Sequence, residues 1–298
     1  MILANAIIAG VNKAGTTSLF VSLSSHPEVF PAAVKETSYF LPPRWGQPIE
    51  DQEVYEAYFS KADTEPIRLE ATPAYFYGGQ PVIDAMKAIL PSNLRILVVL
   101  REPVERFWSF FTFQKARLRI PKEMSALEYL AKSDGLTDSD FSNPSQERWF
   151  AFQGGCYADY LPVWHEALGE NLEIIYFDEL MKQPQQVLEQ VARFLNIDSE
   201  LFPSLELARE NQTTGYKRSG LQRFALAVNT HLEKFLRRHY GLKEKLRSMY
   251  YRINGSTKKE KIPEDIRTVL ADRYQAPNAQ LRSQLQAMGR KLPRWLEG

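Results

Sequence analysis

Residues 6–20 read AIIAGVNKAGTTSLF, and this stretch decides the fold that we expect. It begins with a short apolar run typical of a buried strand, turns between Gly10 and Gly15, and continues with the apolar spacing of a helix. A strand that leads through a glycine-flanked turn into a helix presents unpaired N–H groups and the positive end of the helix dipole at one point. Lys13 adds a full positive charge in the turn. The stretch therefore predicts a site for an oxyanion.

This loop differs from the Walker A pattern of P-loop NTPases, G-x-x-x-x-G-K-[ST], at the most diagnostic residue of that pattern. Gly10 and Gly15 have the required separation, but Lys13 lies inside the loop and Thr16 stands where the pattern has lysine. An ATPase or GTPase is therefore disfavoured. On this loop alone, an ordinary turn that merely contains Gly and Lys is an alternative, because short motifs produce false matches.

Composition restricts the class of protein. The 298 residues carry a net charge of +1 and are 44% hydrophobic, so no global charge favours nucleic acid. The single cysteine, Cys156, excludes an intramolecular disulfide, and the four histidines have no metal-ligand spacing, so we expect no metal. No apolar run reaches transmembrane length and no signal peptide precedes the first strand, so we expect a soluble cytoplasmic protein.

Strands alternate with helices along the first two thirds of the chain, which predicts an α/β fold with a central parallel sheet flanked by helices, as in P-loop NTPases. After the strand at 6–10, the expected strands are Ile67–Glu70, Arg95–Arg101 and Leu172–Phe177. The expected helices are Thr16–Ser25, Asp51–Phe59, Val82–Leu90, one from Pro103, Ser145–Gln153, Tyr157–Leu168, Glu179–Leu195, and closing helices over Ile262–Leu285 interrupted near Pro277.

The last third is mostly helical, so we expect one domain over 1–298 with a helical C-terminal part from about 219 to 298. Residues 231–261 contain ten Lys and Arg against three Glu. This basic segment could face an anionic substrate or a membrane surface, but charge runs of this kind more often form the solvated face of a helical extension.

A second motif, REPVERFWS at 101–109, follows the clearest strand of the sequence. Ligands gather at the carboxyl ends of strands in open α/β sheets, and Arg101 lies at such an end. Its planar guanidinium suits a phosphate, and Ser109 adds a hydroxyl about two helical turns later. The alternative for Arg101 is a salt bridge to Glu105. Arg106 is expected to pair structurally.

Together these motifs resemble those of sulfotransferases that use 3′-phosphoadenosine 5′-phosphosulfate (PAPS). The loop at Lys13 is similar to the 5′-phosphosulfate motif K-x-G-T-[ST], and residues 101–109 match every fixed position of the 3′-phosphate motif R-x-P-x-x-R-x-x-S. Four further segments, in a resemblance from about residue 5 to 290, fit the branch with the heparan-sulfate sulfotransferases and their bacterial relatives. They are KETSYF at 35–40, EATPAYF at 70–76, GCY at 155–157 with Leu161 and Trp164, and the nucleotide-closing loop at 211–220.

The resemblance implies transfer of a sulfuryl group from PAPS to a hydroxyl, less readily an amine, with 3′-phosphoadenosine 5′-phosphate (PAP) as product and no metal. It implies that Lys13 stabilises the bridging oxygen of the leaving group and that Glu36 is the general base. For Glu36 the alternative is a surface carboxylate paired with Lys35. The implied nucleotide-binding residues are Lys13, Ala14, Gly15, Thr16, Thr17, Ser18, Arg101, Ser109, Lys217, Arg218 and Gly220.

One position departs from the family. Many relatives carry lysine in the E-K-[TS]-P segment, and this chain has Ala71 there. Either another cation substitutes or the reaction relies more on Lys13. A glycan acceptor is therefore one of several expectations beside a lipid or another small hydroxyl compound, and the sequence predicts no oligomeric state.

Two other classes of function compete with this reading. A P-loop kinase or NTPase would need a carboxylate for Mg²⁺, whereas the strong strand ends in Arg101. A non-catalytic binding protein on the same fold is disfavoured by the presence of Lys13, Glu36, Arg101 and Ser109 together.

Overall fold

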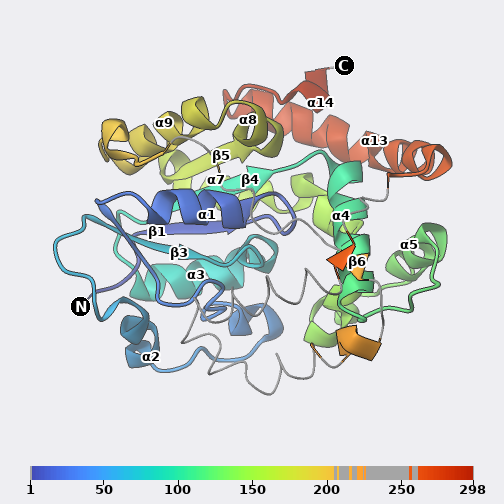
Figure 1. The fold of residues 1–298 in the computed structure, drawn as a ribbon, viewed down its shortest axis with the longest axis horizontal. Coiled ribbons are helices and arrows are strands. Elements are labelled where there is room, and N and C mark those ends of the chain that lie inside the picture. Colours follow the sequence, from blue (N-terminus) through green and yellow to red (C-terminus); the bar gives the residue numbers. More distant parts are fainter. Residues whose placement is uncertain are drawn as a thin grey trace.

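The computed structural model describes residues 2–204 and 261–297, together with residues 207, 215–216, 220–223, 225 and 255–256. Its centre is a parallel five-stranded sheet with the strand order β2-β3-β1-β4-β5 (Figure 1). The expected α/β class is confirmed. The strands are β1 (Ala6–Gly10), β2 (Val29–Pro31), β3 (Ile67–Ala71), β4 (Arg95–Leu100) and β5 (Leu172–Tyr176).

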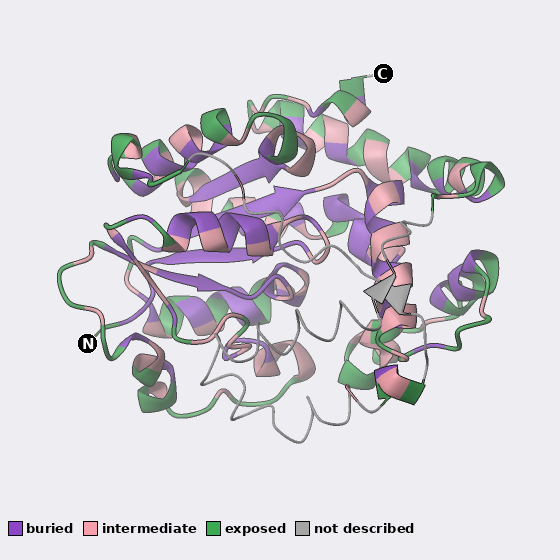
Figure 2. Ribbon diagram, in the orientation of Figure 1, coloured by how far each residue is buried: buried purple, intermediate pink, exposed green. Residues whose placement is uncertain are grey.

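The middle of this sheet is buried because its strands are nearly continuous apolar runs, as parallel sheets covered on both faces require. Every residue of β1 and β5 is buried, and so is β4 after Arg95 (Figure 2). Helix α1 packs on β1, β2 and β3, whereas α7 and α9 pack on β5 and α3 packs on α7. The loops at the carboxyl ends of the strands are thus attached to a rigid centre.

Most helices follow the predicted order. The helices are α1 (Thr16–Ser24), α2 (Gln52–Glu56), α3 (Gly79–Ile89), α4 (Pro103–Ala116), α5 (Ala126–Asp134), α6 (Asp138–Phe141), α7 (Leu161–Leu168), α8 (Phe177–Lys182), α9 (Pro184–Leu195), α13 (Glu264–Ala287) and α14 (Arg294–Glu297). Of these, α5, α6 and α14 were not predicted. Two short strands, β6 (Gly215–Tyr216) and β7 (Gly255–Ser256), pair antiparallel. No helix of the described ranges is long and apolar enough to cross a bilayer.

Two of the expected helices differ from the structure. The helix expected at Ser145–Gln153 is instead a pair of 3-10 turns, Pro144–Trp149 and Gln153–Gly155. The helix expected at Glu179–Leu195 divides at Gln183, because Pro184 starts a new helix, α9, and cannot donate a hydrogen bond within the old one.

Pro277 does not interrupt the closing helix, which is also contrary to expectation. Helix α13 runs unbroken through it for 24 residues. Leu270 and Tyr274 before the proline and Leu281 and Leu285 after it are all buried, so packing on both sides outweighs the one hydrogen bond that proline removes. The edge strand β2, with three residues, was not predicted at all.

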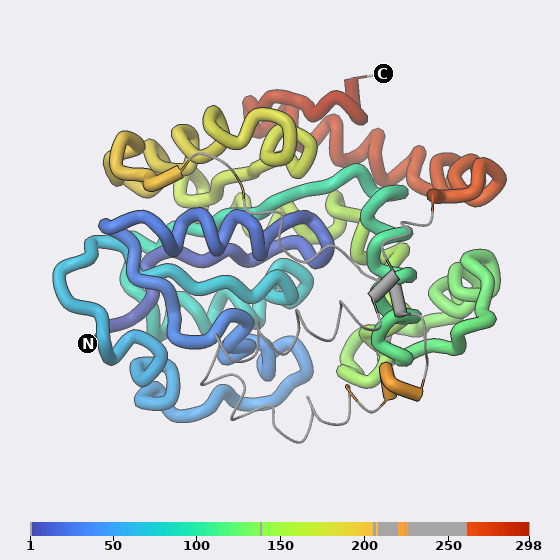
Figure 3. The backbone as a smooth tube through the Cα atoms, viewed as in Figure 1, coloured from blue at the N-terminus to red at the C-terminus, as the bar shows by residue number. Residues whose placement is uncertain are grey.

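A second hydrophobic core joins α4, α5 and α13, and Figure 3 shows the red C-terminal helix running beside the green α4. Its largest members are Phe107, Phe111, Tyr129 and Tyr274. Cys156 also belongs to this core, and burial raises the pKa of its thiol to about 12. This core fixes α4, the helix that begins next to Arg101.

Candidate active site

The loops after the strands of the main sheet meet at one edge, as expected for parallel strands. Lys13 follows β1, Glu36 follows β2, Thr72 follows β3 and Arg101 follows β4. Backbone hydrogen bonds tie neighbouring loops together. The Glu36 N–H donates to the Ala71 carbonyl at 2.9 Å, and the Thr72 N–H donates to Ile8 at 3.1 Å.

The two motifs that are 88 residues apart in sequence touch each other. The Arg101 Nη1 donates to the Lys13 carbonyl at 3.0 Å, and its guanidinium lies 4.6 Å from the centre of the Phe177 ring, at the end of β5. The salt bridge to Glu105 is also present, at 3.4 Å. The buried Arg101 Nε has no hydrogen-bond partner among the described residues. A buried donor of this kind fits a phosphate oxygen, which would supply the missing acceptor.

Lys13 is a strongly perturbed cation. Its Nζ lies 4.2 Å from the centre of the Phe113 ring on α4. The Lys13 pKa is lowered from 10.5 to about 8, mainly by burial and also by the charges of Arg101 and Arg117, whereas Glu36 opposes the shift. The Glu36 carboxylate is therefore near enough to act on the Lys13 ammonium. The backbone of Lys13 is also in the left-handed region, with φ of 71°.

The amino end of α1 has the features of an anion site. Gly15 caps it with φ of 81°, and a Cβ at this position would lie 3.0 Å from the Phe177 ring, so both backbone conformation and packing require glycine. No side chain of the described residues caps this helix end, and its first turn contains no acidic residue. Its N–H groups and dipole therefore point, beside Lys13, toward a place suited to a phosphate.

The surroundings of Glu36 have features of both expected roles, a surface carboxylate paired with Lys35 and a general base. Its side chain is 57% exposed and forms an ion pair with Lys35 at 2.6 Å, as a surface carboxylate would. It also raises the pKa of Lys13, as a group at the reacting centre would. Its φ of 64° is unusual for a residue with a side chain. The ion pair alone does not require that conformation.

Arg106 pairs structurally, as expected. Its side chain is buried and Nη1 donates to the Ala151 carbonyl at 2.7 Å. A Cβ at Gly154 would lie 2.4 Å from Nη2, so glycine is needed for this packing. Ser109 is half-buried on α4, between Arg101 and Phe113 along the helix.

The predicted nucleotide residues beyond position 204 cannot be placed in this site. Lys217 and Arg218 lie outside the described residues. Gly220 is exposed, and a Cβ there would meet no atom within 4 Å. Ala71 ends β3 and is fully buried, so this position supplies no cation.

Sequence reasoning missed Arg117, Phe177, the contact of Phe113 with Lys13 and the role of Glu70. Ser109, Phe113 and Arg117 are spaced by four along α4, so extending the helical face of Ser109 would have identified two of them. Phe177 directly follows β5 and thus occupies a carboxyl strand end. Glu70 lies in β3, whose sequence is IRLEA, and a carboxylate within a strand of the central sheet is a signal for a buried polar group.

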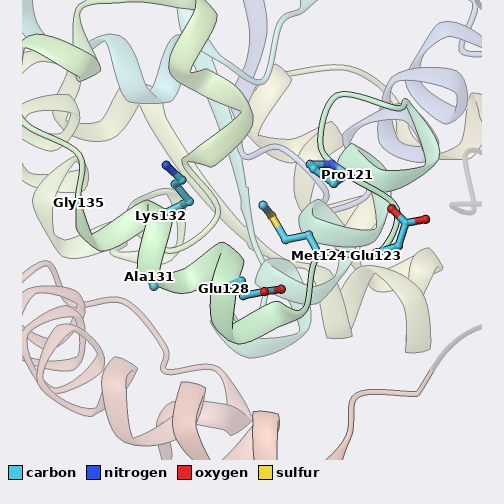
Figure 4. A pocket seen from close by; sticks show the side chains of 7 residues that line it. All are labelled: Pro121, Glu123, Met124, Glu128, Ala131, Lys132 and Gly135. Carbon is cyan, nitrogen blue, oxygen red and sulfur yellow. The ribbon is translucent and has the colours of Figure 1, made fainter.

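Other features of the described residues do not compete with this site. No group of three or more His, Cys, Asp or Glu in the described part could hold a metal ion. A surface hollow lies along α5 and the turn before it, and none of its lining residues belongs to the site described above (Figure 4). It is lined by Pro121, Glu123, Met124, Glu128, Ala131, Lys132 and Gly135.

The fold is a parallel α/β sheet of the P-loop-like kind, and comparison with known proteins specifies the family. A family model for the sulfotransferase domain matches residues 3–275, so the chain belongs to the sulfotransferase family. The solved structure of a sulfotransferase from Alicyclobacillus acidocaldarius aligns over 99% of both chains with a TM-score of 0.71 and 20% identity, which supports the fold.

Two curated relatives are heparan sulfate enzymes. Over 201 residues the chain is 28% identical to mouse heparan sulfate glucosamine 3-O-sulfotransferase 3B1, covering 65% of this chain and 46% of that protein. Over 216 residues it is 24% identical to the bifunctional heparan sulfate N-deacetylase/N-sulfotransferase 1 of Caenorhabditis elegans, covering 70% and 24%. The chain thus spans half or less of the length of these relatives.

Proposed function

We propose that this transferase moves the sulfuryl group of PAPS to a hydroxyl, less readily an amine, of a small-molecule, lipid or glycan acceptor. The observation that carries the proposal is the hydrogen bond from Arg101 to the Lys13 carbonyl, because it brings two phosphate-type motifs to one place. A nucleotide with phosphates at both its 3′ and 5′ positions matches two such groups of donors. One relative is named for O-sulfation and the other for N-sulfation, so both acceptor atoms are tested below.

In this reaction the bond between sulfur and the bridging 5′-phosphate oxygen breaks, and a bond forms between sulfur and the acceptor atom. The acceptor proton passes to the Glu36 carboxylate, and PAP leaves with the negative charge on its oxygen. Lys13 and the N–H groups at the start of α1 stabilise that charge as it develops. Residues 14–18 surround the 5′-phosphate, and Arg101 and Ser109 hold the 3′-phosphate.

Lys217, Arg218 and Gly220 belong to the proposed nucleotide site through the family resemblance alone. We also infer that the whole chain, 1–298, is one domain. Supporting contacts are the packing of α13 on α4 and the hydrogen bond from the Tyr176 hydroxyl to the Lys291 carbonyl at 2.6 Å.

The environment of Glu102 disfavours a P-loop kinase. Such an enzyme needs a carboxylate after the strong strand to hold Mg²⁺. Glu102 is the first carboxylate after β4, and its two oxygens accept the N–H groups of Val104 and Glu105 at 3.0 and 2.7 Å. It therefore caps α4.

The nucleotide is tested by calorimetry with PAP and with ATP, each with and without Mg²⁺. We expect tight binding of PAP that does not depend on Mg²⁺. Tighter binding of Mg–ATP would favour the kinase instead.

The base is tested with labelled PAPS and a panel of alcohols and amines, using Glu36→Gln beside the exposed control Glu53→Gln on α2. We expect Glu36→Gln to lower transfer by about 10²–10⁴-fold while PAP affinity is kept. Loss of PAP binding in Glu36→Gln, or unchanged transfer, would contradict the role of Glu36.

A further inference from the structure

A buried carboxylate lies directly beneath the loop that carries Glu36. Glu70, in β3, is fully buried and accepts hydrogen bonds from four hydroxyls. Its Oε1 accepts from Thr37, Thr72 and Tyr75 at 2.5, 2.8 and 2.8 Å, and its Oε2 accepts from Tyr55 at 2.6 Å. A buried carboxylate is costly unless donors surround it, and here four do so.

The carboxylate determines which way three of these hydroxyls point. A hydroxyl has one hydrogen, so a hydroxyl that donates to Glu70 can only accept from its other neighbours. Three successive backbone N–H groups then donate to these oxygens, each at 3.3 Å. The pairs are Ser38 to Thr72, Tyr39 to Thr37, and Phe40 to Tyr75.

The segment held in this way immediately follows Glu36, and its backbone is strained. Glu36 and Ser38 have φ of 64° and 59°, a region that disfavours residues with side chains. Such conformations persist only when the surroundings impose them. The three hydrogen bonds at residues 38–40, with the bond from the Glu36 N–H to Ala71, provide that constraint.

We propose that Glu70 is a positioning residue: through the hydroxyls of Thr37, Thr72 and Tyr75 it holds the backbone of residues 38–40 and thereby aims the Glu36 carboxylate at the reacting centre. Glu70 does not itself exchange a proton with the acceptor, because it is fully buried and surrounded by four donors. This inference rests on the proposed role of Glu36 as base.

The four hydroxyls provide a matched pair of variants. Tyr75→Phe and Tyr55→Phe each remove one buried hydroxyl from Glu70, but only the Tyr75 hydroxyl accepts a hydrogen bond from the loop backbone. We expect both variants to lose similar unfolding free energy. We expect Tyr75→Phe alone to lower kcat, by about 10- to 100-fold, while its KM for PAPS and its PAP affinity stay at the values of the parent.

Amide hydrogen exchange separates this inference from the proposed function. Exchange at residues 38–40 should accelerate in Tyr75→Phe and not in Tyr55→Phe, whether or not Glu36 is the base. Equal exchange and equal kcat in the two variants would overturn the role of Glu70. Faster exchange with unchanged kcat in Tyr75→Phe would overturn it as well, because the held loop would then not matter to the reaction.

A second pair of variants covers the case in which a tyrosine variant fails to fold. Thr72→Val keeps the shape of the side chain and removes its hydroxyl, whereas Thr72→Ser keeps the hydroxyl. Serine should retain most of kcat and valine should not. Equal kcat in these two variants would also contradict the proposal. In Glu36→Gln, loss of transfer with normal amide exchange at residues 38–40 would support Glu36 as the base and Glu70 as the positioning residue. Retained transfer would refute Glu36 as the base, and amide exchange in the tyrosine variants would then decide the role of Glu70.

Discussion

The two sides of β1 differ in how completely the protein satisfies its own charges. On the β4 side, Lys13 has a pKa lowered to about 8 and the buried Arg101 Nε has no hydrogen-bond partner within the described ranges. On the β3 side, the Glu70 carboxylate is surrounded by four hydroxyl donors. The β4 side thus has a buried donor that an anion could satisfy. On the β3 side both Glu70 oxygens have donors within the protein, although burial still raises the pKa of Glu70. Ligand affinity should therefore originate on the first side and alignment on the second.

Among the variants that test this contrast between the two sides of β1, the largest effect is expected from Lys13→Met. Removing one preorganised donor to a developing oxyanion costs about 10²–10³-fold in rate. The same change should stabilise the ligand-free protein. Below pH 8 the ammonium is charged in both folded and unfolded states, and its lowered pKa corresponds to a penalty of up to about 3 kcal/mol on folding. That penalty disappears as pH rises from about 8 to 10.5.

Labelled-sulfate transfer and thermal unfolding at pH 7 measure the two results for Lys13→Met. Lys87→Met, on the exposed face of α3, serves as the control and should change neither. A Lys13→Met protein that melts at a lower temperature than the parent would show that the Lys13 ammonium does not destabilise the ligand-free fold. The proposed difference between the two sides of β1 would then be wrong.

A smaller effect is expected from Arg101→Ala, and it should be specific to the 3′-phosphate. Hydrogen bonds to charged groups contribute about 1.5–3 kcal/mol, so PAP affinity should fall by about 10- to 100-fold. Adenosine 5′-phosphate lacks the 3′-phosphate, so its affinity should change much less. Calorimetry with both ligands measures the ratio, and Arg273→Ala, which breaks a surface pair with Asp134, is the control. Equal losses for the two nucleotides would place Arg101 elsewhere on the ligand.

The smallest effect is a pH dependence of PAP binding. On the proposed function the protonated Lys13 binds the 5′-phosphate of PAP, so the affinity for PAP should fall above pH 8, by at most about tenfold per pH unit. Binding should also take up a proton near pH 8.5, which calorimetry in two buffers with different ionisation enthalpies detects. PAP affinity that stays constant from pH 7 to 9.5 would contradict a lowered Lys13 pKa.

Sequence reasoning succeeded where the signal is local. The backbone conformation could be predicted from the apolar runs at 6–10, 95–100 and 172–176 and from the glycines around Lys13. The sheet and the position of its loops were therefore predictable. The continuity of α13 through Pro277 could not be predicted, because the burial of residues on both sides of Pro277 depends on tertiary packing.

The site was predictable only in part for the same reason. Lys13 and Arg101 each lie in a motif, and the structure brings them together. The role of Glu70 depends on Thr37 and Tyr55, which come from separate segments of the chain, and no spacing in the sequence shows that they meet.

The burial of Cys156 has a practical consequence for these experiments. Its thiol is the only one in the chain, and with a pKa near 12 it is almost entirely unreactive toward maleimides at neutral pH. A cysteine introduced at exposed Val269 on α13 would therefore accept a fluorophore alone. Val269 lies two residues from Arg267, which shares Glu105 with Arg101, so the emission of this fluorophore can be tested for a response to PAP with no native cysteine removed.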